Sequence, residues 1–102
     1  MATRIQFRDR LQEVLGVDHL YFQPPSGFKM EYDCCVYKVA HRPAKHADNI
    51  RYLNHTQYEC TLIFRDPDSD LPQKLIDGFQ YIEHNRSFAV DHLNHEVFLV
   101  YY

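Results

Sequence analysis

The stretch from Gln57 to Arg65 constrains the fold more than any other part of the chain. Its apolar residues take every second position, and polar residues fill the positions between them. The apolar set is Tyr58, Cys60, Leu62 and Phe64. A period of two is typical of a β-strand with one buried face, because successive side chains of a strand point to opposite faces. The chain must therefore build a sheet and pack something against one side of it.

The length of the chain allows one such domain. With 102 residues, two domains would each be near the size at which a core needs disulfides, metals or oligomerisation. A content of 45% hydrophobic and 25% charged residues is that of an ordinary globular protein. We therefore predict a single domain that spans residues 1–102.

Two segments have the spacing of amphipathic helices. The first runs from Thr3 to Leu15, where Thr3 is suited to the N-cap and Gly16 to the C-cap. We assign its buried stripe to Ile5, Leu11, Val14 and Leu15. Phe7 lies outside that stripe, so we expect an exposed aromatic residue with a partner outside the core.

The second helix begins near Pro72, after the turn chemistry of residues 66–70. Its shared apolar face consists of Leu71, Leu75, Ile76 and Phe79. Gly78 weakens its end, and Tyr81-Ile82 either extends the helix or leads out of it.

Other runs are typical of strands. Leu20–Phe22 is short and leads toward a sheet rather than forming its centre. Tyr32–Ala40 is apolar on both faces, so it needs a helix layer on one side and another layer, such as a second subunit, on the other. Ser87–Val90 and Val97–Tyr102 flank Asp91–His95 as a terminal hairpin.

The order of these elements gives the fold class. A helix, two or three strands, a helix and two strands predict an α+β domain with a mostly antiparallel β-sheet and two α-helices packed against it. Between the second and third strands, His41–Asn54 has no apolar periodicity and is predicted to be a long loop.

Charge and cysteine content narrow the function classes. A net charge of −3 argues against a general nucleic-acid binder, which usually carries a basic patch. Three cysteines, two of them adjacent, cannot all pair, which favours a reducing compartment. The start of the chain lacks the apolar run of a signal peptide, and no window approaches the ~18 apolar residues of a membrane span. We expect a protein made in a cytoplasm and without membrane contact.

Three chemical sites can be drawn from the residue inventory. Asp66, Asp68 and Asp70 have the spacing of a calcium loop, but Leu71 stands where that loop needs glycine, and an acidic turn is the alternative. Histidine and cysteine side chains could bind zinc, yet they lack the usual paired spacing. They are His92, His95, Cys34, Cys35 and Cys60. A thiol nucleophile at Cys34 or Cys35 would sit inside a strand, away from a helix N-terminus. We predict no catalytic residue, no cofactor and no metal.

Aromatic residues make up 15% of the chain, more than a small core needs. Because tyrosines are favoured at protein interfaces, we predict self-association or partner docking. The predicted aromatic interface residues are Phe7, Tyr32, Tyr37, Tyr101 and Tyr102. In the long loop we add Arg42, Lys45, Arg51 and Tyr52, which could contact nucleic acid or simply be solvated.

Several motifs together resemble the small tail terminator, or tail completion, proteins of siphophages. They are Arg4-Ile5-x-Phe7-Arg8-x-x-Leu11-x-x-x-Leu15-Gly16, the run from Val17 to Pro25, Arg65-Asp66-Pro67-Asp68-Ser69-Asp70, and the run from Asp91 to Phe98. The resemblance spans most of the chain, and its motifs are structural rather than catalytic. The segment Pro43–Leu53 departs from the family pattern, so the family's binding residues are not carried over to it.

The resemblance implies a non-enzymatic virion protein that is assembled in the host cytoplasm and located at the head-tail junction. Its subunits would form a ring, commonly a hexamer, that caps the tail tube, stops its polymerisation and meets the head connector, or stopper, protein. The long loop would face a lumen through which genomic DNA passes. Two alternatives stay open: another connector component, such as a stopper or adaptor, and a small cytoplasmic enzyme or ligand-binding domain that uses the cysteines and histidines.

Overall fold

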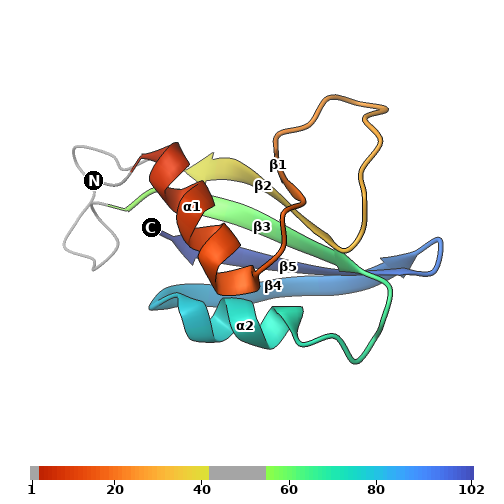
Figure 1. Ribbon diagram of the computed structural model, residues 1–102. Coiled ribbons are helices and arrows are strands. Elements are labelled where there is room, and N and C mark those ends of the chain that lie inside the picture. The colour runs from red at the N-terminus through yellow and green to blue at the C-terminus, as the bar shows by residue number, and fades with distance from the viewer. Residues whose placement is uncertain (1–2, 42–54) are drawn as a thin grey trace.

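Two helices lie on one side of a five-stranded sheet in the computed structural model, which describes residues 3–41 and 55–102 (Figure 1). In chain order the elements are α1 (Arg4–Leu15), β1 (Leu20–Phe22), β2 (Cys34–His41), β3 (Gln57–Phe64), α2 (Leu71–Gly78), β4 (Tyr81–Val90) and β5 (Leu93–Tyr101). The strand order is β1-β2-β3-β5-β4, and every neighbouring pair except β1 and β2 is antiparallel. The predicted α+β class, with a mostly antiparallel sheet and two helices, is confirmed.

The ends of α1 follow the capping prediction. Thr3 accepts a hydrogen bond from the Gln6 backbone N–H, and the Gln6 side chain accepts one from the Thr3 backbone N–H, which completes a capping box. Gly16 ends the helix in the left-handed region at φ 71°, where a side chain would be strained.

The predicted buried stripe of α1 was wrong at one position. Phe7, Leu11 and Leu15 are buried, whereas Ile5 is 53% exposed. Residues 7, 11 and 15 are four apart and therefore lie above one another on one face of the helix. Phe7, which we predicted to be an exposed aromatic residue, is therefore buried in the core.

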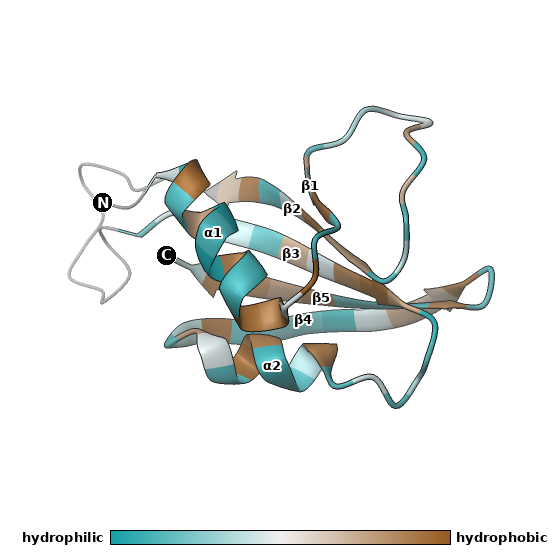
Figure 2. Ribbon diagram, viewed as in Figure 1, coloured by the Kyte–Doolittle hydropathy of each residue, from teal (hydrophilic) through white to brown (hydrophobic). Residues whose placement is uncertain are grey.

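Both helices pack against the same face of the sheet. One core cluster contains the buried residues of α1 and α2 together with alternate residues of β2, β3 and β5. The sheet residues in this cluster are Leu20, Cys35, Tyr37, Tyr58, Cys60, Leu62, Phe64, Phe98 and Val100. Hydrophobic and hydrophilic residues alternate along the helices and strands, as an element with one covered face requires (Figure 2).

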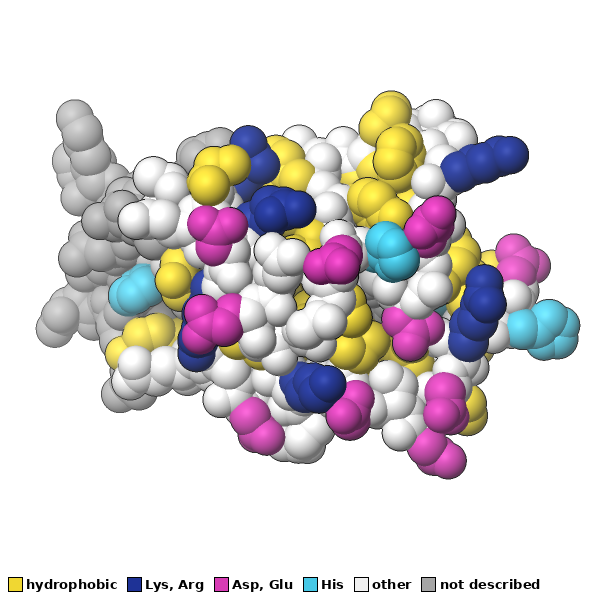
Figure 3. Space-filling view, in the orientation of Figure 1, with side chains coloured by type: hydrophobic (Ala, Val, Ile, Leu, Met, Phe, Trp, Pro, Cys, Tyr) yellow, Lys and Arg dark blue, Asp and Glu magenta, His cyan; other side chains and the backbone are white. Residues whose placement is uncertain are grey.

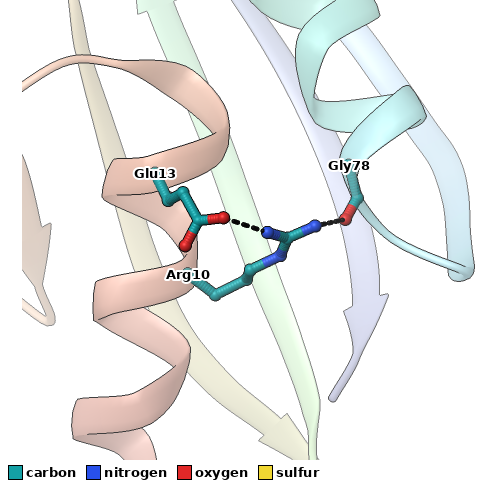
Figure 4. A network of polar contacts seen from close by, with 3 residues as sticks. All are labelled: Arg10, Glu13 and Gly78. Carbon is teal, nitrogen blue, oxygen red and sulfur yellow. Dashed lines mark hydrogen bonds and ion pairs between the residues drawn. The ribbon is translucent and has the colours of Figure 1, made fainter.

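The two helices pack closely against each other at the C-terminal end of α2. A Cβ atom at Gly78 would overlap the Val14 side chain, so glycine allows the close approach of the helices. The Arg10 guanidinium donates to the Gly78 carbonyl oxygen at 3.1 Å and pairs with the Glu13 carboxylate at 2.6 Å (Figure 4). One arginine thereby ties α1 to the C-terminal end of α2.

The terminal hairpin is longer than the sequence predicts. Tyr81 and Ile82 begin β4 rather than extend α2, and β4 continues to Val90. Only Asp91 and His92 form the turn, with φ values of 53° and 65°. Positive φ at both central residues matches the right-handed twist of the two strands that the turn joins. The hairpin therefore reaches past the helices at one end of the molecule (Figure 1).

Candidate functional site

The second face of the sheet carries no helix within the described residues, because α1 and α2 both belong to the core on the opposite face. Opposed residues of neighbouring strands share a face, so the register identifies the side chains on this one. They are Cys34, Val36 and Lys38 of β2; Gln57, Glu59, Thr61 and Ile63 of β3; His95, Val97, Leu99 and Tyr101 of β5; and Tyr81, Glu83, Arg86, Phe88 and Val90 of β4. We call this set the open face.

The open face combines apolar side chains with polar and charged ones, which occur in the central strand β3 as well as at the margin. Ile63 and Val97 are buried, while Val36 and Leu99 are half-buried and reach the surface. Lys38 at the margin pairs with Glu59 at 3.4 Å. Protein-protein contact surfaces commonly combine apolar and polar side chains in this way.

The hairpin extends this apolar surface away from the core. Phe88 is 42% exposed and Val90 is 51% exposed, although both are large hydrophobic residues. The Phe88 ring stacks on His95 with centroids 4.6 Å apart and planes 13° apart, and the Arg86 guanidinium lies 5.9 Å from its centroid. The end of the hairpin thus presents an ordered aromatic group to solvent.

Tyr101 and Tyr32 are predicted aromatic interface residues that remain partly accessible and lie outside the core cluster. Tyr101 is half-buried on the open face, where its hydroxyl accepts from Gln57 at 2.7 Å and donates to Glu83 at 3.1 Å. Tyr32 is half-buried and directly precedes β2. These two residues remain interface predictions.

Phe7 and Tyr37 are corrections to the predicted interface. Phe7 is 0% exposed and stacks on Tyr58 with ring centroids 3.9 Å apart, and Tyr37 is 1% exposed. Both side chains lie in the core between the helices and the sheet, so neither offers surface to another protein. Tyr102 is half-buried on the same side, with its ring centroid 5.4 Å from that of Phe7 and 5.8 Å from that of Phe79.

The remaining predicted contact residues belong to the loop after β2. Arg42, Lys45, Arg51 and Tyr52 lie outside the described residues, as does most of the predicted loop His41–Asn54.

The cysteines are packed as small core residues. Cys34, Cys35 and Cys60 are all buried and unpaired. Burial, together with the neighbouring Cys35 and Asp33, raises the pKa of Cys34 to about 12, and burial also raises the pKa of Cys60 well above its usual value. Because the thiolate is the nucleophile, Cys34 and Cys60 are inert near neutral pH.

Sequence inspection did not find one polar cluster, formed by His84, Ser87 and Glu96 on the helix side of the hairpin. The His84 Nε2 atom lies 2.9 Å from the Ser87 hydroxyl and 3.3 Å from the Glu96 carboxylate, to which Ser87 donates at 3.2 Å. Ser87 and Glu96 also line an open pocket of about 380 Å³ beside Phe64 and Pro67. In a catalytic triad the acid binds the imidazole nitrogen that faces away from the serine, whereas here serine and acid share Nε2. The cluster therefore lacks the arrangement that activates a serine.

The acidic stretch before α2 is organised as a turn. Asp66 accepts the Asp68 backbone N–H at 2.9 Å through its side chain, and its carbonyl oxygen accepts the Ser69 N–H at 2.9 Å. Asp70 occupies the N-cap position of α2 and pairs with Lys74 at 3.5 Å. Among the described residues, no group of three or more histidine, cysteine or acidic side chains is placed to hold a metal ion.

No family model, curated protein or solved structure matches the chain. Within residues 3–41 and 55–102, neither helix combines the length and apolar character needed to cross a membrane.

On the face that carries the helices, acidic and basic side chains are interspersed rather than gathered by sign (Figure 3). The open face is therefore the described surface with the clearest capacity to bind a partner.

Proposed function

We propose that this protein is a structural component of a virion. In this proposal it forms a ring at the head-proximal end of a long non-contractile phage tail, ends polymerisation of the tail tube and joins the tail to the head connector. The motif resemblance is the reason to consider a phage tail, and the open face is the structural observation that supports the proposal.

The open face suits a subunit that is incomplete on its own. A ring needs head-to-tail interfaces that close by rotation, and each subunit must bury apolar surface beyond its own core. Val36 and Leu99 offer such surface at the centre of the sheet, and Tyr101 offers a large ring with a polar tip. The ring number expected from the resemblance is six.

The proposed partners are further copies of the chain, the major tail tube protein and the connector, or stopper, protein. Contact with DNA would be limited to passage through the lumen. The net charge of −3 and the interspersed charges of the helix side support that restriction, because tight phosphate binding requires a concentration of basic side chains.

A charge placed on the open face tests the proposal. Val36→Glu introduces a carboxylate at a half-buried position in β2, and Ile76→Glu is the control on the outer side of α2, where Ile76 is 42% exposed. We expect Val36→Glu to abolish ring formation on purified tail tubes and Ile76→Glu to preserve it, with both variants folded by circular dichroism. Normal ring formation by a folded Val36→Glu variant would refute the use of this face.

The choice between a terminator and another connector component rests on the binding partner. The proposed terminator would bind the end of the tail tube directly, whereas another connector component would bind the connector without the tube. Pull-down with tubes alone and with connector alone distinguishes the two, and binding to connector alone would contradict the terminator role.

A further inference from the structure

We propose that two copies of this chain pair in solution through their β4 edges, antiparallel and about a two-fold axis. The result is a continuous sheet of ten strands, five from each copy. This inference is independent of the phage role, because it rests on the backbone and charges of β4 alone.

The first observation is that β4 is a long and uncovered edge. It is one of the two edge strands of the sheet, it has ten residues, and all of its residues from Glu83 to Val90 are exposed. An edge strand of this length presents a row of backbone donors and acceptors to any chain of matching geometry.

The second observation is which backbone groups face outward. The two-residue turn makes Val90 and Leu93 the closing pair, whose backbone groups bind each other, and successive pairs alternate from there. The register shift between His84 and Arg86 adds one residue to β4, and the alternation continues beyond it. The backbone groups that point away from β5 therefore belong to alternate residues, apart from this extra residue. They are those of Ile82, His84, Ser87 and Ala89.

The third observation is the effect of the irregularity on two charges. The register shift leaves Asn85 as an extra residue, so Glu83 and Arg86 oppose Leu99 and Val97 and lie on the same face. In a regular strand, residues three apart would point to opposite faces. The bulge thus brings an acid and a base to one side of an exposed edge.

Within the described part of the chain, neither of these charges has an ion-pair partner. Glu83 accepts a hydrogen bond from the Tyr101 hydroxyl at 3.1 Å, and Arg86 lies over the Phe88 ring. Both charges are exposed. Each is therefore available to an opposite charge on another molecule.

One antiparallel register pairs the outward backbone groups and also brings the opposite charges together. It pairs the outward backbone groups of Ile82 with those of Ser87 in the second copy, and the reverse by symmetry. Glu83 then lies opposite Arg86 of the second copy, and Tyr81 lies opposite its Phe88. These cross-strand pairs fall where side chains approach most closely, and opposite charges and aromatic pairs are favourable there.

Charges on edge strands commonly prevent sheet-to-sheet pairing. They do so when like charges meet. In this register Glu83 and Arg86 each meet their opposite charge, so these two residues select one partner and one alignment. Since a two-fold pair closes on itself, it is a form distinct from a head-to-tail ring.

Charge reversal and charge exchange test the register. Glu83→Arg and Arg86→Glu each place like charges opposite one another at both ends of the pair. We expect each to raise the dimer Kd by about tenfold or more in sedimentation equilibrium. The exchange variant carrying both changes restores opposite charges, so its Kd should return to within about threefold of the original.

Lys29→Glu and Asp77→Arg are matched controls, because both residues are exposed and lie outside β4. We expect them to leave the dimer Kd unchanged. A wild-type chain that is monomeric at millimolar concentration would overturn the proposal, as would an exchange variant that fails to recover. These experiments contain no tail tubes, so a failed pairing is distinguishable from a failed ring.

Discussion

Replacement of Phe7 by alanine should cost most of the stability of the domain. The Phe7 ring is fully buried, stacks on Tyr58 at 3.9 Å and lies within 6 Å of Tyr37, Phe79 and Tyr102, measured between ring centroids. Removal of a buried phenylalanine side chain costs about 3–5 kcal/mol. We expect a loss of about 4 kcal/mol in the free energy of unfolding, since this one residue of α1 contacts β2, β3 and the residues that follow α2 and β5.

Urea unfolding followed by circular dichroism measures this loss. For a domain of this size, about 4 kcal/mol lowers the midpoint by about 2–3 M urea. Phe7→Leu, which removes less volume, should cost about 1–2 kcal/mol and keeps the test informative if Phe7→Ala does not fold. Ile5→Ala on the exposed side of the same helix is the control, with an expected change within about 0.5 kcal/mol. A Phe7→Ala variant as stable as the control would refute the assignment of Phe7 to the core.

Three smaller perturbations test other parts of the account. Thr3→Ala removes the capping box with Gln6 and should lower the free energy of unfolding by about 1 kcal/mol, measured by urea titration. Gly78→Ala would drive a methyl group into Val14 and should lower the melting temperature by several degrees, corresponding to about 1–3 kcal/mol. The raised pKa of Cys34 means that the folded chain keeps a proton that the unfolded chain releases, so the free energy of unfolding should fall as the pH rises from 9 toward 12. The same thiol should resist iodoacetamide at pH 8 until urea unfolds the chain. A rise in stability over that pH range, or alkylation of the native protein, would contradict the burial of the thiol.

The sheet and its covered face followed from local pattern. The alternation of residues 57–65 predicted β3, which spans Gln57–Phe64, and Thr3 and Gly16 predicted both ends of α1. These features depend on side chains a few positions apart, so the sequence contains the whole signal.

The error at Phe7 came from the choice between two stripes. Phe7, Leu11 and Leu15 are four residues apart and share one helix face, whereas Ile5 is six residues from Leu11 and lies on another face. That signal was present and was read wrongly. Tyr37 illustrates a different limit, because a strand that is apolar on both sides does not say which side the helices will cover.

The hairpin and the polar cluster depended on information that a local pattern lacks. The strongest sequence signals for a two-residue turn of this kind end in glycine, so Asp91-His92 gave a weaker indication of it. Because that turn sets the register of β4 against β5, the meeting of His84 with Glu96 could not be predicted either.

The mass of the assembly formed on tail tubes tests the central claim most directly. The purified protein should be measured by light scattering over a concentration series, alone and after addition of tail tubes, with the tube ends imaged by electron microscopy. Our account predicts a closed ring at the tube end, and tubes that stop growing once it binds. A protein whose mass never changes in the presence of tubes, and that leaves the tube ends bare, would contradict the proposed function.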